Sequence, residues 1–343
     1  MTGRFGARVG GYSGSLRAAL DRKDPRAPML ITDQLTADQS RAVRDLLRRT
    51  RDHDGVDALD EPARLQARPD APAAGTVHIC APAGDDGQDP EGGDTTSAIA
   101  GYASILDDGT VQGMVDPLHR RRGVATRIWT AAKEQRMDLA VWAHGALAPA
   151  TQFLTGHGLV ATRTLLTMRR SFRTAGEGTA GGATAGPDVP AGVELTTFDA
   201  DRDTDDWVRL NAEAFASHPE QGRMTAEDLA ARQGEPWFDA EGFHIAREND
   251  QMLGFVWTKR EVDDSGSPSP EAEIYVVATA PAAQGRGIGA ALLVAALDRL
   301  QQRGAEDVLL YVEGEATAAI RLYERYGFAI SGRDVQFRLQ EHA

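Results

Sequence analysis

The sequence has 343 residues, of which 41% are hydrophobic and 26% are charged, and its formal net charge is −14. This composition is typical of a globular protein, and the length is enough for two domains with separate cores. The negative charge argues against a general nucleic-acid-binding protein, because too few Lys and Arg residues remain to neutralise phosphates. An acidic surface could favour a cationic substrate such as an amine, although solubility alone is the more common reason for it.

Several features argue against export, membrane insertion and metal binding. No segment approaches the roughly 18 consecutive apolar residues of a membrane span, and the N-terminus lacks the apolar core of a secretory signal. The single cysteine, Cys80, cannot form an internal disulfide bond and supplies no metal cluster. We therefore expect a cytoplasmic monomer with no metal ion and no nucleic-acid or membrane partner.

Segments rich in glycine, proline and small polar residues divide the chain. Residues 1–28 have no sustained periodicity and predict a flexible N-terminal extension. Residues 173–190 lack an apolar anchor and predict an interdomain linker. The remaining chain then forms two domains, residues 29–172 and 191–343, with solvated loops expected at residues 81–96 and 263–270.

The two halves contain the same motifs in the same order. Each has a glycine–aromatic pair in an apolar run, then a Pro-x-x-x-x-Arg-Gly element, a helical segment, a short apolar strand and a second helix that ends at a glycine. Such a repeat predicts a tandem duplication. The matching pairs are Gly101-Tyr102 and Gly254-Phe255, Pro117–Gly123 and Pro281–Gly287, Leu139–Trp142 and Val308–Val312, and His157-Gly158 and Tyr326-Gly327.

Hydrophobic periodicity predicts the elements of the C-terminal half. Apolar residues at 292, 293, 296, 297 and 300 have the spacing of one helix face, and Gly304 follows as a stop signal. The expected strands cover residues 272–279, 308–312 and 335–339, and the expected helices cover residues 289–303 and 317–326.

A glycine-rich segment, Gln284-Gly285-Arg286-Gly287-Ile288-Gly289, opens the first of these helices and is called the glycine loop below. Glycines allow left-handed backbone and close approach of a ligand, and the first amides of a helix attract negative charge. The loop therefore predicts a pyrophosphate site, with Arg286 beside it. A dinucleotide-binding motif would need its first glycine directly after a strand, and a P-loop would need Gly-Lys-Ser/Thr, so we reject both.

The glycine loop and the later run Ala318–Phe328, which ends in Tyr326-Gly327-Phe328, together resemble the GNAT superfamily of N-acetyltransferases. The resemblance implies an α/β (α+β) fold with two tandem GNAT domains. In each domain a mixed, mostly antiparallel twisted sheet is flanked by helices. It also implies acetyl-CoA as cosubstrate, with its pyrophosphate on the glycine loop and its pantetheine along a bulged strand at Val277–Thr279.

The resemblance assigns cofactor contacts in both halves. In the C-terminal half they are Val277, Ala278, Thr279, Gln284, Gly285, Arg286, Gly287, Ile288, Gly289, Ala290, Ala316, Thr317, Ala318, Ala319, Ile320 and Arg321. In the N-terminal half they are Gly113, Met114, Val115, Arg121, Arg122, Gly123, Val124, Ala125 and Thr126.

Acetyl transfer to an amine needs a neutral amine, a stabilised oxygen and a proton for the leaving thiolate. Glu273 begins the strand that leads into the glycine loop, and the resemblance makes it the general base, with the amide near Val277 polarising the thioester. The resemblance also makes Tyr323 the general acid. Taken alone, Glu273 could equally be a solvated strand-end charge, and Tyr323 would more often be core packing.

The N-terminal half lacks both chemical groups. Alignment of Gly123 with Gly287 puts Gly109 opposite Glu273, and alignment of Gly158 with Gly327 puts Leu154 opposite Tyr323. We therefore expect this half to keep a groove of the CoA-binding type without catalysing the reaction.

Motifs spread over most of the chain resemble the mycothiol synthase (mycothiol acetyltransferase) family. Among them are Phe215-Ala-Ser-His-Pro-Glu-Gln221 and Phe255-Val-Trp-Thr-Lys259. The resemblance implies acetylation of the cysteinyl amine of des-acetylmycothiol, a Cys-glucosamine-inositol conjugate. The implied substrate contacts are Glu61, Glu220, Lys259, Glu273 and Tyr311. Two alternatives stay open, namely acetylation of another small amine or a protein N-terminus, and a CoA-binding sensor without enzymatic activity.

Overall fold

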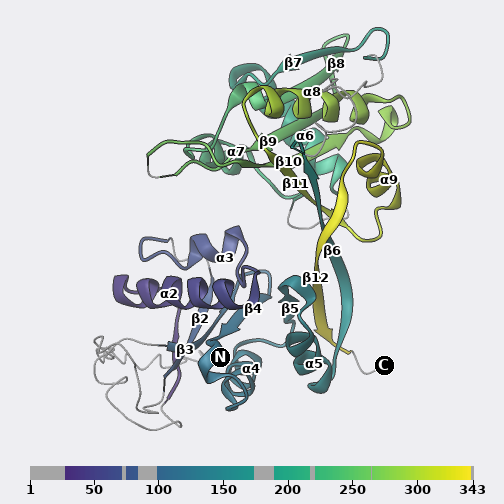
Figure 1. Ribbon diagram of the computed structural model, residues 1–343. Coiled ribbons are helices and arrows are strands. Elements are labelled where there is room, and N and C mark those ends of the chain that lie inside the picture. The colour runs from purple at the N-terminus through teal and green to yellow at the C-terminus, as the bar shows by residue number, and fades with distance from the viewer. Residues whose placement is uncertain are drawn as a thin grey trace, which may run out of the picture. The chain divides into compact units, whose positions relative to one another are not determined.

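The computed structural model describes residues 28–71, 75–83, 99–173, 189–216, 221–263 and 265–340. Almost all of the expected N-terminal extension and linker, and most of the expected loop at 81–96, lie outside these residues. The chain forms two compact units (Figure 1). One comprises Met1–Thr164 with Asp334–Ala343, and the other comprises Leu165–Arg333. They are called the N-terminal and C-terminal units below.

The N-terminal unit is built on a mixed sheet in the order β1-β2-β3-β4-β5-β12, in which only β4 and β5 are parallel. The helices α2 and α3 share one apolar cluster with the sheet and α4 shares another. Its elements are β1 (Leu30–Thr32), α2 (Ala37–Asp54), α3 (Glu61–Gln66), β2 (Val77–Pro82), β3 (Ile99–Ile105), β4 (Thr110–Val115), η2 (Pro117–His119), α4 (Val124–Gln135), β5 (Ala140–Ala143), η3 (His144–Ala146), α5 (Ala148–Gly156) and the start of β6 (Leu159–Ser171).

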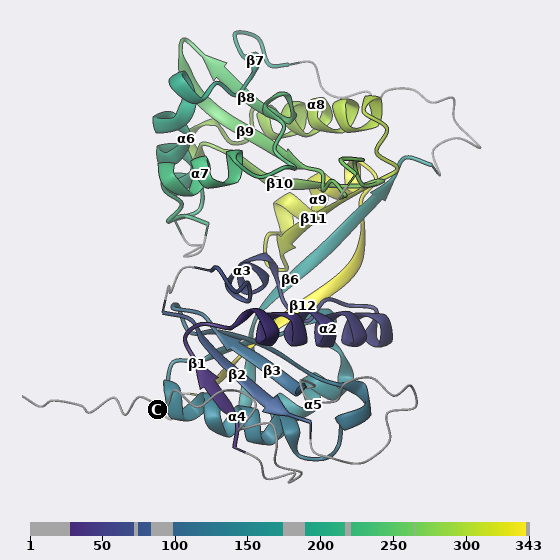
Figure 2. The same cartoon turned by 90° about the vertical axis from the view of Figure 1, so that its left-hand side faces the viewer.

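The C-terminal unit has the corresponding sheet in the order β6-β11-β10-β9-β8-β7, in which only β10 and β11 are parallel. Figure 2 shows β8, β9 and β10 side by side, with α8 along them. Its elements are β7 (Glu194–Thr197), α6 (Ala200–Ala214), α7 (Ala226–Gln233), η5 (Ala240–Gly242), β8 (Phe243–Glu248), β9 (Gln251–Lys259), β10 (Glu271–Thr279), η6 (Pro281–Ala283), α8 (Ile288–Gln302), β11 (Asp307–Glu313), α9 (Thr317–Arg325) and the start of β12 (Ala329–Leu339).

Apart from the short 3₁₀ turns η3 and η5, the order of elements is the same in both halves of the chain: a strand, two helices, three strands, a short turn of 3₁₀ helix, a helix, a strand, a helix and a last strand. The predicted tandem duplication and the predicted fold class are therefore confirmed.

The last strand of each repeat completes the sheet of the other unit. Residues 335–338 of β12 pair with β5, and residues 165–171 of β6 pair with β11. The compact units therefore differ from the consecutive halves expected from the sequence, because a period-two pattern specifies which face of a strand is buried but not which strand lies beside it. In the N-terminal unit, Asp334 accepts hydrogen bonds from the backbone N–H of Gly145 at 2.7 Å and from the His144 ring at 3.1 Å.

The repeated glycine–aromatic pairs have a packing reason. A Cβ atom at Gly254 on β9 would lie 2.8 Å from the carbonyl oxygen of Ala278 and 3.1 Å from Cδ1 of Leu292 on α8. A Cβ atom at Gly101 on β3 would lie 2.8 Å from the side chains of Val124 and Ile128 on α4. In both repeats the glycine lets the helix that follows the loop pack directly on the sheet.

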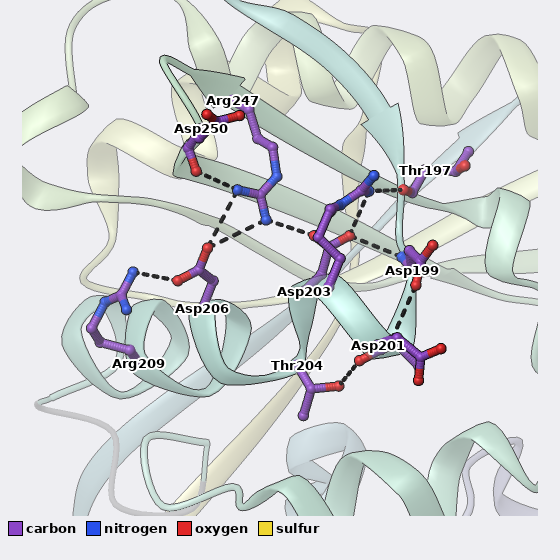
Figure 3. Close-up of polar contacts among 11 residues, drawn as sticks. Thr197, Asp199, Asp201, Asp203, Thr204, Asp206, Arg209, Arg247 and Asp250 are labelled. Atoms are coloured by element: carbon purple, nitrogen blue, oxygen red, sulfur yellow. Dashed lines mark hydrogen bonds and ion pairs between the residues drawn. The ribbon is translucent and has the colours of Figure 1, made fainter.

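A buried ionic network fixes α6 against β8 and the hairpin that follows (Figure 3). The fully buried Asp203 accepts hydrogen bonds from Arg202 at 2.8 Å and from Arg247 at 2.6 Å. Arg247 also donates to the carbonyl oxygen of Asp250 and to Asp206. Burial opposes ionisation of Asp203, but the hydrogen bonds from Arg202 and Arg247 outweigh it and lower the pKa of the carboxyl group.

Candidate active site

The strand β10, which leads into the glycine loop, contains a β-bulge at Tyr275. Ile274 lies opposite Thr258 and Val276 lies opposite Trp257, so Tyr275 is the additional residue. The bulge is just ahead of the Val277–Thr279 segment that the sequence predicted as the bulged strand.

Beyond the bulge, β10 separates from its parallel neighbour. The ladder between β10 and β11 joins residues 271–274 to residues 307–310. No further register pair joins the two strands among the described residues, although β11 continues to pair with β6 as far as Glu313. The segment Val277–Thr279 therefore runs along the side of β10 where the parallel ladder has ended, which suits a ligand that hydrogen-bonds to strand backbone.

The glycine loop has the backbone geometry of an anion site. Gly285 and Gly287 have φ angles of 77° and 85°, in the left-handed region, and Gly287 is the N-cap of α8 without a side-chain cap. A Cβ atom at Gly289 would lie 3.3 Å from Oγ1 of Thr279, so this glycine allows α8 to start close to β10. The first N–H groups of α8 therefore remain available to a phosphate.

Arg286, the cationic residue of the loop, is held by a carboxylate from β8. Its two terminal nitrogens lie 2.7 and 3.0 Å from the two carboxylate oxygens of Glu248. The hydrogen bonds from Arg286 lower the pKa of Glu248. The guanidinium keeps further N–H donors in this arrangement, because a bidentate pair uses only two of its five.

Three of the predicted acceptor contacts lie on one face of the sheet. Glu273 is directly opposite Lys259 on β9 and Leu309 on β11, and residues opposite each other share a face. Tyr311 is two residues beyond Leu309 and has the same orientation. Tyr311 is half exposed, at 50% of its surface.

Lys259 lies in an aromatic environment on that face. Its ammonium nitrogen is 4.8 Å from the ring centre of Trp237, 5.5 Å from that of Tyr275 and 2.9 Å from Oε1 of Glu261. The side chain is 8% exposed. A charge at this depth is stabilised by its carboxylate partner and by the faces of the two rings.

The predicted acid, Tyr323, lies on α9 and is 6% exposed. Its ring centre is 5.9 Å from that of Phe328 in an edge-to-face arrangement. Burial raises the pKa of Tyr323 to about 12, so the phenol keeps its proton at neutral pH. The predicted contacts Ala316, Thr317, Ala318, Ala319, Ile320 and Arg321 form the N-cap and first turns of the same helix.

The N-terminal repeat retains the loop backbone but differs around it. Gly123 is the N-cap of α4 at φ 80°, and Arg121, which corresponds to Gly285, also has a left-handed φ of 63°. Strand β4 pairs with β3 without a register shift, so it has no counterpart of the bulge at Tyr275. Gly109 lies in the turn before β4, and Leu154 is buried on α5.

The other two predicted substrate contacts are not among the described residues of this sheet. Glu61 begins α3 in the N-terminal unit. Glu220, with the neighbouring His218 and Pro219, lies outside the described residues.

Sequence reasoning missed the rings beside Lys259 and the arginine that donates a hydrogen bond to one of them. Arg232 and Trp237, on α7 and just after it, carry no motif, and Tyr275 was part of a predicted strand without a role. The only local signal was the density of aromatic residues between 237 and 275.

The comparisons with known proteins point to acetyltransferases. Residues 206–328 match the Acetyltransferase (GNAT) family. A mycothiol acetyltransferase of Brachybacterium faecium is 43% identical over 91% of this chain and 99% of its own length. A mycothiol acetyltransferase of a Parafrankia species is 38% identical over 87% of this chain and 94% of its own length.

The chain belongs to the mycothiol acetyltransferase family. It is accordingly an N-acetyltransferase of the GNAT type, and the predicted enzyme class is confirmed. Members of the GNAT superfamily use acetyl-CoA as cosubstrate. No helix in the described part of this family member is long and apolar enough to cross a membrane.

Solved structures support the tandem GNAT fold of this mycothiol acetyltransferase family member. A tandem GNAT protein from the clavulanic acid biosynthesis pathway has a TM-score of 0.63 at 17% identity and covers 90% of this chain and 98% of its own. A GCN5-related N-acetyltransferase from Sphaerobacter thermophilus has a TM-score of 0.61 at 20% identity over 90% of this chain and 94% of its own.

Proposed function

We propose that the protein transfers the acetyl group of acetyl-CoA to the cysteinyl amine of des-acetylmycothiol, giving mycothiol and CoA. The observation that carries the proposal is the common face of Glu273, Lys259 and Tyr311 beside the point where β10 and β11 separate. The acceptor is a polyhydroxylated conjugate with a free amine. Carboxylate, ammonium and phenol groups suit it because each exchanges hydrogen bonds with hydroxyl or amine groups.

The cosubstrate would bind along β10 and on the glycine loop. The uncapped amides of α8 and the guanidinium of Arg286 would hold the pyrophosphate, and the backbone of Val277–Thr279 would pair with the pantetheine. A side chain at Gly285 or Gly287 would strain a left-handed backbone, so the sequence of the loop is consistent with this role.

In the proposed reaction Glu273 accepts a proton from the ammonium form of the acceptor, directly or through water, and the free amine attacks the thioester carbon. The backbone amide near Val277 donates to the carbonyl oxygen as negative charge develops on it. The carbon–sulfur bond then breaks, and the Tyr323 hydroxyl donates its proton to the leaving sulfur. Solvent accepts the second proton from the acylated nitrogen, so that the amide is neutral, and returns a proton to Tyr323. Glu273 releases its proton to solvent.

We assign no catalytic role to the N-terminal unit. Its loop has left-handed backbone at Arg121 and Gly123, which supports a CoA-type groove lined by the predicted contacts. The position of the base is occupied by Gly109 and that of the acid by Leu154, so neither proton transfer has a side chain to perform it.

The release of free CoA with a panel of amines tests the substrate. The protein would be incubated with acetyl-CoA and des-acetylmycothiol, the glucosamine-inositol conjugate without cysteine, or a peptide with a free N-terminus. We expect kcat/KM for des-acetylmycothiol to exceed the other values by at least about 100-fold, as hydrogen-bonding sites discriminate strongly. Fastest turnover of the peptide would favour a protein substrate, and no turnover of any amine would contradict the proposal.

A further inference from the structure

We propose that Arg232 is a positioning residue for the acceptor site and that it acts through the hydroxyl group of Tyr275. The inference rests on the proposed function, since it concerns the face that carries Glu273 and Lys259. The contact through which it acts is the hydrogen bond from Arg232 to the Tyr275 hydroxyl.

The guanidinium of Arg232 is aimed by its own helix. Nη1 donates to the carbonyl oxygen of Asp228, one turn earlier in α7, at 3.0 Å, and Nε donates to the hydroxyl oxygen of Tyr275 at 2.9 Å. Because the guanidinium group is planar and rigid, the first bond sets the direction of the second. Arg232 is half-buried, and so is Tyr275.

Tyr275 is the additional residue of the bulge, and the bulge sets which face of the sheet carries the residues on either side of it. Val276 lies opposite Trp257, and Glu273 lies opposite Lys259. Both β10 residues therefore lie on the face of the sheet that also carries Trp257 and Lys259 of β9. The ring of Tyr275 packs on the same side, 5.2 Å from the ring of Trp257. The bulge thus groups Glu273, Tyr275 and Val276 on one face, which a regular strand would not do.

The same ring also holds the ammonium group of Lys259. Tyr275 and Trp237 lie 5.3 Å apart between ring centres, and Lys259 is above both rings. A hydrogen bond to the Tyr275 hydroxyl therefore restrains the β10 backbone two residues after the proposed base. It also restrains the Tyr275 ring, which lies beside the ammonium group of Lys259. Loss of this hydrogen bond should make the β10 backbone and the Tyr275 ring more mobile without removing any group that the reaction uses.

Two single substitutions and their combination test this chain of contacts. Tyr275→Phe removes the acceptor and keeps the ring, and Arg232→Met removes the donor and keeps an unbranched side chain. We expect each to lower kcat with des-acetylmycothiol by about tenfold, with KM for acetyl-CoA within about twofold of wild type, as expected for one hydrogen bond to a charged group. The double variant should be no slower than either single variant, because both remove the same bond.

Arg209→Met is the matched control, because Arg209 on α6 pairs with Asp206 in its own helix and has an exposed side chain. This variant should keep wild-type kcat, and the melting temperatures of all variants would be measured alongside. Losses that multiply in the double variant, or unchanged kcat in both single variants, would overturn the inference.

Hydrogen exchange of the β10 amides separates this inference from the substrate assignment. We expect exchange in the peptide covering residues 271–279 to be faster in Tyr275→Phe and Arg232→Met than in wild type or Arg209→Met. If wild type does not acetylate des-acetylmycothiol and exchange still rises, the substrate is wrong and the positioning contact stands. If exchange does not rise, the positioning contact is wrong whatever the substrate.

Discussion

Tyr323 illustrates how the environment of a single side chain limits its chemistry. Burial raises its pKa to about 12, which keeps the phenol protonated and able to donate, but also makes it a weaker acid than an exposed tyrosine. A free thiol has a pKa of about 8.5, so transfer of the Tyr323 proton to the leaving sulfur is energetically uphill and depends on the return of a proton from solvent to the phenolate. Loss of the hydroxyl should therefore lower kcat only moderately.

We predict that Tyr323→Phe lowers kcat by about 10- to 100-fold and leaves KM for acetyl-CoA within about twofold, since the ring stays in the core. Steady-state kinetics with both substrates would measure this. If the variant had the kcat of wild type, Tyr323 would be a packing residue and not the general acid.

The same residue predicts a dependence of stability on pH. The folded-state pKa of Tyr323 is raised above the ordinary value of 10, so its contribution to stability is complete below pH 10 and is lost as the pH rises towards 12. Denaturant unfolding at pH 8 and pH 11 should show a smaller loss of stability for Tyr323→Phe than for wild type. An equal loss in both proteins would contradict the assigned pKa.

Individual residues could be predicted from the sequence only where they belong to a motif. Gly287 and Glu273 have positions defined by the loop and the strand before it. Arg232 does not, because its importance arises from a contact with Tyr275 that no spacing in the sequence encodes.

At the scale of elements, the two glycine N-caps provide a matched comparison. Gly287 and Gly123 have φ angles of 85° and 80°, and a Cβ atom at either position would meet no other atom within 4 Å. Replacing either with alanine should cost about 1–2 kcal/mol of stability from left-handed backbone strain alone. We predict that only Gly287→Ala also raises KM for acetyl-CoA, by about tenfold or more.

Melting temperatures and acetyl-CoA titrations of the two variants would measure both effects. Equal increases in KM for Gly287→Ala and Gly123→Ala would indicate that the N-terminal loop supports turnover as much as the C-terminal loop does.

Element boundaries followed closely from hydrophobic period and glycine stops. The helix expected at residues 289–303 is Ile288–Gln302, and the strand expected at 308–312 is Asp307–Glu313. The strand expected at 335–339 begins earlier, at Ala329. Residues 335–338 pair with β5, and the two compact units divide the strand between residues 333 and 334, which the pattern of side chains along one strand does not encode.

At the scale of the whole molecule, the two repeats share a fold but differ in the side chains proposed to transfer protons, which are present in one repeat and absent from the other. Both repeats keep the loop before the helix and the parallel strand pair, but only the C-terminal repeat has the bulge, Glu273 and Tyr323. The duplication was visible in the sequence because motifs recur in order. The exchange of the last strands was not, because it concerns pairing between distant segments.

The most direct test of this division is the rate of acetyl transfer to des-acetylmycothiol by Glu273→Gln, compared with wild type. The substitution keeps the size of the side chain and removes the basic carboxylate, and loss of a general base costs about 100- to 10,000-fold. We predict a fall of at least about 100-fold in kcat, with unchanged binding of acetyl-CoA. Wild-type turnover by Glu273→Gln would contradict the account, because the reaction would then not depend on the C-terminal repeat as described.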